Sequence, residues 1–275
     1  MKEIIINSFD EYREIVVKHK YHEWVYRGQN NAEYLLESSL YRALKRNEDI
    51  RAKNKEKKRS LKRELYESEM IELFQRTSHL YLNKYPDKKN VFDWLSIMQH
   101  YGSPTRMLDF SFSPYISLYF AIANASSDAA VFCINYHTIK SINETKFDNI
   151  NEKYTTMMGN ENNIDNTILV PFEPEFKNER LFVQQGMFLV PNTLRFSHHE
   201  ILSKYEKGKN DLYLKIIIKP ENFVEIVTEL LRMNIQASSI YPGFEGFCKS
   251  FETIGILPIA SIRHLPNLLK KDLKG

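Results

Sequence analysis

Several polar side chains of this sequence stand in short motifs beside glycine, at the ends of segments that alternate between apolar and polar. Arg27 lies in Tyr-Arg-Gly-Gln, and its guanidinium offers five donors in a rigid fork that suits a phosphate or a carboxylate. A structural salt bridge would use the same fork, and the motif leaves both interpretations open. Gly28 and Gln29 complete the motif and are candidate cofactor-binding residues, because glycine permits a ligand to approach the backbone closely.

Gln99 and His100 stand at the end of a predicted helix that Gly102 closes. Both are candidate catalytic residues. A histidine can transfer a proton near neutral pH or donate a hydrogen bond to a substrate. The alternative for His100 is a side chain tied to its own backbone, with a purely structural role.

The loop after this helix carries Thr105 and Arg106, both candidate cofactor-binding residues. Arg106 and Asp109 can instead pair with each other, which would make them structural. Ser113 precedes a proline, and this order is typical of a helix start. Because a helix N-terminus also attracts anions, Ser113 is a candidate catalytic residue as well as an N-cap.

Two further candidates come late in the sequence. A strand is predicted over residues 180–190, and alternation along it would direct either Gln184 or Gln185 towards a cleft. A glutamine in a cleft can bind an amide or a ribose hydroxyl, and Gln185 is the candidate catalytic residue. Glu245 lies in the first turn of a helix predicted after Pro242, where a carboxylate is also favoured for local electrostatic reasons.

The elements that position these side chains follow from hydrophobic periodicity. Helices are predicted at residues 9–20, 64–82, 94–101, 114–122, 221–234 and after residue 242. Strands are predicted at residues 24–29, 129–136, 180–190 and 212–218. Residues 141–166 hold seven asparagines and little periodicity, which indicates a surface insertion. The pattern predicts a single α+β domain over residues 1–275, with a mixed or split β-sheet and a helix-rich N-terminal half.

Charge is concentrated in one segment. Residues 42–63 contain eleven Lys or Arg against three acidic residues, a local charge of +8, whereas the rest of the chain holds 27 basic and 32 acidic side chains. Such a segment can be an arm that binds nucleic acid. It can equally be a solvated basic helix or connector, and the lack of aromatic side chains among the charges, which base stacking would need, favours this second interpretation.

Other classes of protein are disfavoured by composition. No run approaches the roughly 18 apolar residues of a membrane span, and the N-terminus lacks a signal-peptide core. The two cysteines, Cys133 and Cys248, form neither a disulfide framework nor a metal spacing. No Walker loop or Rossmann glycine fingerprint is present. We therefore expect a cytoplasmic protein with no metal and no membrane partner.

Four segments carry a family resemblance. They are VYRGQ (25–29), IMQHYGSPTRMLDFSFSPYISLYFAIANA (97–125), ERLFVQQGMFLVP (179–191) and SIYPGFEGF (239–247). Together they resemble the FRG domain family, from about Trp24 to Phe251, and the second segment is the most specific. The resemblance implies an FRG-like fold and a setting in toxin or phage-defence systems.

The order of an early arginine, a Ser-Pro helix start and a late Gln or Glu is also similar to the ADP-ribosyltransferase superfamily. That similarity implies NAD as a substrate, with a carboxylate that stabilises the oxocarbenium-like centre formed when its glycosidic bond breaks. The candidate catalytic residues of such an enzyme are Arg27, Gln99, His100, Ser113, Gln185 and Glu245. The implied partners are a nucleotide and a protein or nucleic-acid target. The second hypothesis is a non-catalytic module that binds nucleic acid through residues 42–63.

Overall fold

The computed structural model describes residues 2–54, 62–146, 164–175, 177–205 and 212–254. The strands are β1 (Lys2–Ile6), β2 (Trp24–Gln29), β3 (Leu108–Ser111), β4 (Ala129–Asn135), β5 (Leu169–Phe172), β6 (Gly186–Pro191) and β7 (Tyr213–Ile218). The first helices are α1 (Phe9–Val16), α2 (Ser39–Lys53), α3 (Arg63–Thr77), η1 (Ser78–Leu80), α4 (Val91–His100), α5 (Pro114–Ile122) and α6 (Tyr136–Lys146). The later ones are η2 (Ile164–Asn166), α8 (Glu179–Val183), α9 (His198–Tyr205), η3 (Pro220–Asn222), α10 (Phe223–Arg232), α11 (Ala237–Ile240) and α12 (Gly243–Ile254).

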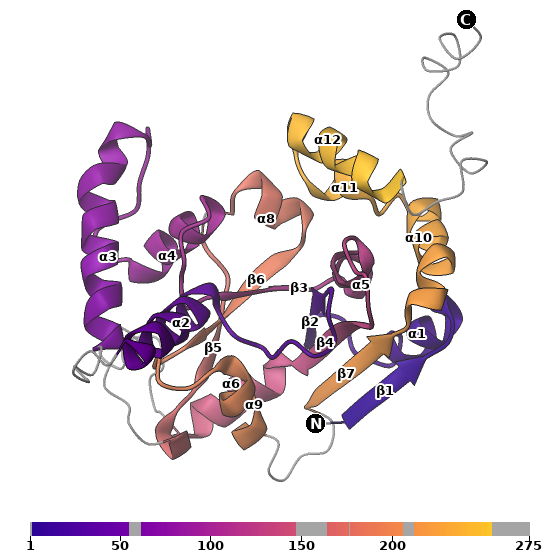
Figure 1. Ribbon diagram of the computed structural model, residues 1–275, viewed down its shortest axis with the longest axis horizontal. Coiled ribbons are helices and arrows are strands. Elements are labelled where there is room, and N and C mark those ends of the chain that lie inside the picture. Colours follow the sequence, from indigo (N-terminus) through magenta and orange to yellow (C-terminus); the bar gives the residue numbers. More distant parts are fainter. Residues whose placement is uncertain (1, 55–61, 147–163, 176, 206–211, 255–275) are drawn as a thin grey trace, which may run out of the picture.

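Seven strands form one mixed sheet in the order β1-β7-β4-β2-β3-β6-β5 (Figure 1). β1 runs parallel to β7, and the other neighbouring strands pair in antiparallel fashion. The predicted α+β class with a mixed sheet is therefore confirmed. The helix-rich N-terminal half is confirmed as well, because α2, α3 and α4 follow one another between β2 and β3.

The middle of the sheet is nearly divided between β2 and β3. β2 pairs with β4 along its whole length, from Trp24 to Gln29, and β3 pairs with β6 along its whole length. β2 and β3 themselves share a single register pair, Tyr26 with Ser111. The two strands therefore separate beyond this pair, and the second half of β2 has a free edge towards β3.

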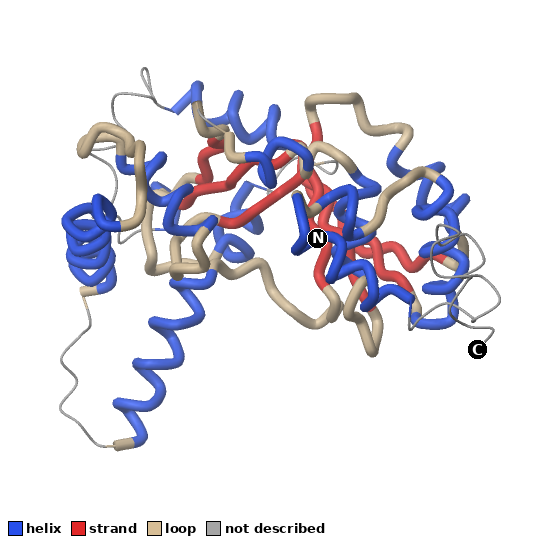
Figure 2. Tube along the Cα trace, turned by 90° about the horizontal axis from the view of Figure 1, so that it is seen from above, coloured by secondary structure: helices blue, strands red, loops and turns tan. Residues whose placement is uncertain are grey.

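Helices cover both faces of the sheet. α1, α5 and α10 pack on one face, around buried side chains such as Leu118 and Ile226. α6 and α9 pack on the other face, around Ile139 and Ile201. α3, α4 and α8 surround β6, with Leu95 in their shared core. Figure 2 shows the sheet between these layers and the end of α2 projecting from the body.

The prediction of a strand over residues 180–190 is wrong for the first half of that range. α8 occupies that part, and β6 begins only after Gln184 and Gln185. The side chain of Asn178 caps α8 by accepting a main-chain N–H, and Glu179 lies in the first turn. A cap and an early carboxylate stabilise a helix start against the strand preference of a Leu-Phe-Val run. The two glutamines therefore lie in a turn, where the alternation of a strand does not apply.

Two predicted segments fall partly outside the described residues. Within the basic segment 42–63, α2 and the start of α3 are helical, and residues 55–61 lie outside the described part. Within the predicted insertion 141–166, α6 and η2 occupy the two ends, and residues 147–163 lie outside the described part.

Candidate functional site

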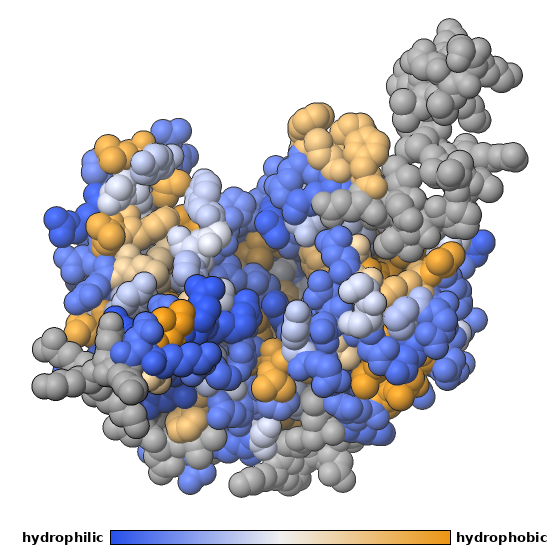
Figure 3. Space-filling model, in the orientation of Figure 1, coloured by the Kyte–Doolittle hydropathy of each residue, from blue (hydrophilic) through white to orange (hydrophobic). Residues whose placement is uncertain are grey.

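A cavity of about 930 Å³ opens where β2 and β3 separate. Figure 3 shows the surface hollowed between the side of the molecule that carries α3 and the side that carries α12. The lining comes from several elements. They are strands β2, β3 and β6, helices α2, α4, α5 and α8, the loop after β2, and Tyr241. Its described polar lining residues include Arg27, Gln29, Asn30, Glu33, Glu37, Arg42, Lys45, Gln99, His100, Asp109, Ser111, Ser117 and Arg180.

Arg27 and Asp109 bridge the gap between β2 and β3. An Nη nitrogen of Arg27 donates to the main-chain oxygen of Asp109 at 2.8 Å and lies 3.8 Å from its carboxylate. A side chain thus makes the cross-strand contact at the point where the strand ladder has ended. Burial lowers the pKa of Arg27, while the neighbouring Asp109 raises it and Arg42 lowers it. The charge of Arg27 is therefore partly offset inside the cavity.

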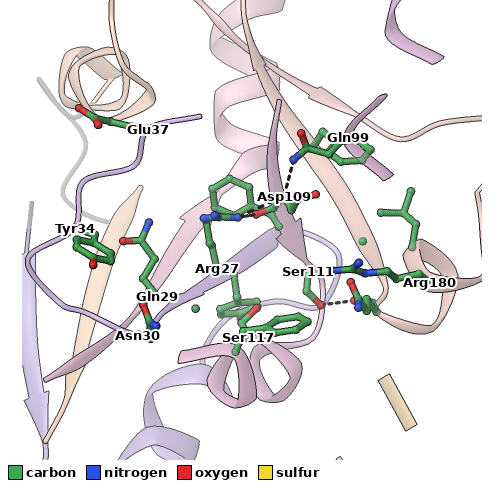
Figure 4. A pocket seen from close by; sticks show the side chains of 18 of the residues that line it. Arg27, Gln29, Asn30, Tyr34, Glu37, Gln99, Asp109, Ser111, Ser117 and Arg180 are labelled. Atoms are coloured by element: carbon green, nitrogen blue, oxygen red, sulfur yellow. Dashed lines mark hydrogen bonds and ion pairs between the residues drawn. The ribbon is translucent and has the colours of Figure 1, made fainter. Parts of the chain in front are cut away.

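Hydrogen bonds from α4 and the following loop orient the carboxylate of Asp109. Gln99 Nε2 donates to Asp109 Oδ2 at 2.8 Å (Figure 4). Gln99 Oε1 accepts from the hydroxyl of Thr105 at 2.5 Å. These two partners define which end of the Gln99 amide is oxygen. The N–H of Thr105 in turn donates to Ser39 Oγ at 3.1 Å. Gln99 and Thr105 are therefore placed as supports of Asp109.

Gly28 allows α5 to lie directly against β2. A Cβ atom at this position would be 2.0 Å from the main-chain oxygen of Ser117 and 2.5 Å from the main-chain nitrogen of Ala121. Both are backbone atoms of a packed helix, so they cannot give way without moving the helix. The absence of a side chain at Gly28 thus brings Ser117 of α5 to the wall of the cavity.

Three buried polar side-chain atoms of the described residues have no hydrogen-bond partner, and all three belong to residues that line this cavity. They are Nε of Arg27, Oε1 of Gln29 and Oγ of Ser117. Figure 4 shows Arg27, Gln29 and Ser117 among the side chains that line the cavity. Buried polar atoms in native proteins almost always have partners, so these three atoms distinguish the lining of the cavity from the rest of the described interior.

The described lining contains more basic than acidic side chains. The basic ones are Arg27, Arg42, Lys45 and Arg180, and the acidic ones are Glu33, Glu37 and Asp109. Lys45 Nζ lies 3.4 Å from the carboxylate of Glu37, and the guanidinium of Arg180 lies 4.9 Å from the centre of the Tyr241 ring. The described lining therefore has a formal excess of one positive charge, and two of its cations, Arg27 and Lys45, already lie beside carboxylates.

His100 lines the cavity, and its surroundings disfavour the protonated form of the imidazole. Burial lowers its pKa and Arg180 lowers it further, whereas Glu245 raises it. Its ring packs edge-on against Tyr101 at 4.9 Å. A neutral imidazole can accept a proton or donate a hydrogen bond, so the predicted acid-base role of His100 stays a prediction.

The structure brings only part of the predicted site together. The predicted residues that line the cavity are Arg27, Gly28, Gln29, Gln99 and His100. The predicted residues outside its described lining are Thr105, Arg106, Ser113, Gln185 and Glu245. Gln184, the neighbour of Gln185, lines the cavity and donates from Nε2 to the main-chain oxygen of Ile240 at 3.0 Å.

Arg106 lies in the core and holds α3 to the sheet. The suggested pairing of Arg106 with Asp109 is wrong, because Arg106 pairs with Glu67 of α3 instead. Its Nε lies 2.9 Å from both carboxylate oxygens of Glu67, and an Nη donates to the main-chain oxygen of Pro191 at 3.0 Å. Both partners of this ion pair are almost completely buried. Arg106 therefore has a structural role, and its partner Glu67 lies 39 residues earlier in the sequence.

The other outlying candidates have local contacts. Ser113 Oγ accepts the N–H of Ile116 at 3.2 Å, which confirms the predicted N-cap of α5. Gln185 is exposed and has a φ of 48°, in the left-handed region that non-glycine residues rarely adopt. Glu245 pairs with Lys249 at 3.1 Å on the exposed side of α12.

Ser117 and Arg180 are lining residues that the sequence patterns did not single out. Ser117 is a serine within the otherwise apolar helix Pro114–Ile122. A polar side chain on a buried helical face was the feature of the sequence that could have identified it as a candidate site residue. Arg180 follows the cap of α8 and is recognised as a lining residue only once α8 is placed beside β6.

Metal and membrane signals are absent from the described part of the chain. Among its residues, no group of three His, Cys, Asp or Glu side chains is arranged to hold a metal ion. None of its helices combines the length and the apolar character needed to cross a membrane. The predicted nucleic-acid surface on residues 42–63 stays a prediction; of its described residues, Arg42 and Lys45 face the cavity.

Residues 22–130 match the family model of the FRG domain. The matched range contains β2, β3 and α5, and with them Arg27, Asp109 and Ser117. The opposite wall, formed by α8, β6 and Tyr241, lies beyond it. Comparisons with curated proteins and with solved structures gave no match.

Proposed function

From the FRG domain and the cavity that it lines on one side, we propose that this protein binds NAD or a related nucleotide and cleaves the bond between nicotinamide and ribose. The observation that carries the proposal is the cavity itself, with basic side chains at its rim and unpartnered hydrogen-bonding groups deeper in. Its volume of about 930 Å³ falls within the usual range for small-molecule sites.

The charge pattern supports a ligand with both anionic and neutral polar parts. Arg42, Lys45 and Arg180 offer cations to a diphosphate. Gln29 and Ser117 are uncharged and better suited to hydroxyl or amide groups. A dinucleotide such as NAD carries both kinds of group on one molecule.

Asp109 is the carboxylate best placed for the chemical step. Cleavage sends the electron pair of the C1′–N bond to the pyridine nitrogen and leaves positive charge on the ribose. Water or an acceptor side chain then attacks C1′ and loses a proton. A fixed carboxylate stabilises the charge that develops. Asp109 lines the cavity and its Oδ2 is held by Gln99, whereas Glu245 lies outside the lining.

Incubation of the purified full chain with NAD, with nicotinamide measured by chromatography, tests this proposal. We expect release of nicotinamide by the wild-type protein, and its loss in Arg27→Ala. Arg13→Ala is the matched control, because Arg13 is an exposed arginine of α1 that pairs only with nearby Asp10 in the described contacts.

Two results would count against the proposal in different degrees. Absence of both NAD binding and nicotinamide release would reject it entirely. Binding without release would remove the cleavage step and leave a nucleotide-binding protein. A role in a toxin or phage-defence system belongs to the same proposal, because loss of NAD stops the metabolism on which phage growth depends.

A further inference from the structure

The four basic side chains that line the cavity differ in how far their hydrogen-bond donors are already used. Arg27 and Arg42 each donate to a main-chain oxygen, and Lys45 pairs with the carboxylate of Glu37. Within the described part of the chain, the guanidinium of Arg180 has neither a hydrogen bond nor an ion pair, and it contacts an aromatic ring instead. Its donors are therefore the ones most available to a ligand.

Resting on the nucleotide-binding function proposed above, we infer that Arg180 binds the phosphate groups of the nucleotide, with Tyr241 as its positioning residue. The guanidinium carbon of Arg180 lies over the Tyr241 ring, 4.9 Å from its centre. Stacking uses the flat face of a guanidinium and leaves the N–H groups at its edge free to bind the oxygens of a phosphate. The ring is itself held, by Phe120 edge-on at 6.1 Å and by Lys249 Nζ at 4.2 Å.

A second donor lies two residues before Arg180. Asn178 also lines the cavity, and its Oδ1 caps α8 by accepting the N–H of Leu181 at 2.8 Å. Because the cap uses the amide oxygen, Nδ2 is left as a donor, and it has no partner in the described part of the chain. The start of α8 thus offers both a charged and a neutral donor, and a phosphate can accept from both kinds.

The carboxylates of the lining lie elsewhere in the cavity. All three come from β3 or from the segment between β2 and α2, whereas α4, α8 and Tyr241 contribute none to the described lining. Figure 4 shows Arg180 and Glu37 on opposite sides of the view, with Asp109 between them. A phosphate on Arg180 therefore stays away from Glu37, and the ribose attached to it can lie towards Asp109, the carboxylate proposed for cleavage.

Arg27 is the less suitable arginine for a phosphate. Its Nη donates to the main-chain oxygen of Asp109 at 2.8 Å, and the carboxylate of Asp109 lies 3.8 Å from the same nitrogen. A phosphate bound at Arg27 would meet this negative charge at close range. Arg180 offers the same guanidinium chemistry without a carboxylate beside it among the described contacts.

Isothermal titration of the full chain with inorganic pyrophosphate and with ADP-ribose tests the inference. Arg180→Gln removes the charge and the fork, so we expect both ligands to bind at least about tenfold more weakly, the effect of losing a charge-assisted hydrogen bond. Arg180→Lys keeps the charge without the planar fork and should recover only part of that loss. Arg13→Gln, which changes the exposed arginine of α1, is the control and should leave both affinities unchanged.

Two variants of Tyr241 test its positioning role. Tyr241→Phe keeps the ring and should bind pyrophosphate as the wild type does. Tyr241→Leu removes the ring and should bind it about threefold more weakly, the effect of losing a cation–π contact. Thermal unfolding establishes that each variant is folded at the temperature of titration. Equal pyrophosphate affinities of the two folded variants would show that the ring does not position Arg180.

The inference and the proposed function fail in different ways. Unchanged affinity of Arg180→Gln for either ligand, or a larger loss in Arg42→Gln, overturns the inference and leaves nucleotide binding intact. Pyrophosphate binding that depends on Arg180, without release of nicotinamide from NAD, removes the proposed cleavage and leaves the inference standing. A wild-type protein that binds NAD but neither test ligand overturns the inference alone, and one that binds none of the three contradicts both.

Discussion

Arg27 donates to the main-chain oxygen of Asp109 at 2.8 Å, while the carboxylate of the same residue lies farther away, at 3.8 Å. The short contact that holds Arg27 therefore does not depend on the side chain of Asp109. The carboxylate is oriented separately, by Gln99 Nε2 at 2.8 Å. Asp109 thus positions Arg27 through its main-chain oxygen, and it presents a negative charge to the cavity through its side chain.

This separation predicts the effect of Asp109→Asn. The main-chain contact to Arg27 stays, and a half-exposed ion pair contributes only about 0–1 kcal/mol to stability, so the unfolding midpoint should change little. Removal of a negative charge should strengthen ADP-ribose binding, while nicotinamide release should fall by at least about 100-fold. Calorimetry and the release assay measure the two effects. Unchanged release would show that Asp109 takes no part in cleavage.

Gly28→Ala should destabilise the fold by about 1–3 kcal/mol, the usual cost of overpacking. The added methyl group would meet main-chain atoms of Ser117 and Ala121, which move only with α5. Gly186→Ala is the control, because its nearest contact is the end of the flexible Leu181 side chain. Urea unfolding compares the two variants. Equal losses would contradict the close packing of α5 on β2.

The buried Arg106–Glu67 pair should behave as a unit. Arg106→Met alone leaves an unpaired buried carboxylate, and we expect a loss of about 3–5 kcal/mol. The double variant Arg106→Met with Glu67→Leu removes both charges and should recover much of that stability. Urea unfolding of both variants tests this. A double variant that is less stable than Arg106→Met would contradict the interpretation.

Stability should fall as the pH drops from about 6.5 to 4, in part because of His198. Burial lowers the pKa of this histidine to about 4, with Arg27 and Arg106 acting in the same direction against the hydrogen bond to Leu189. Between the two values only the unfolded chain binds the proton, so stability rises with pH and is fully present above 6.5. This histidine contributes at most about 1.4 kcal/mol per pH unit.

Urea unfolding at several pH values isolates this contribution by comparing wild type with His198→Gln. The glutamine keeps a donor for the main-chain oxygen of Leu189 and does not titrate. The variant should therefore show a shallower dependence on pH between 6.5 and 4. Parallel curves would show that His198 does not lose its proton on folding.

Local features of the sequence predicted much of the secondary structure and the match to a known domain family. The Ser113 cap followed by proline predicted the start of α5, and the apolar run after residue 129 predicted β4. The motifs around Arg27 and Gln99 pointed to the FRG domain, which matches residues 22–130. Caps, turns and periodicity depend on residues only a few positions apart, and therefore a single sequence reveals them.

Only the tertiary structure decided which polar residues meet. Arg27 contacts Asp109 from 82 residues away, and Arg106 pairs with Glu67 rather than with its near neighbour Asp109. These contacts depend on the order of the strands and on the separation of β2 from β3 after one shared pair. Strand order and separation result from how distant helices pack on the sheet, and no local spacing records them. The cavity therefore becomes apparent only in the folded chain.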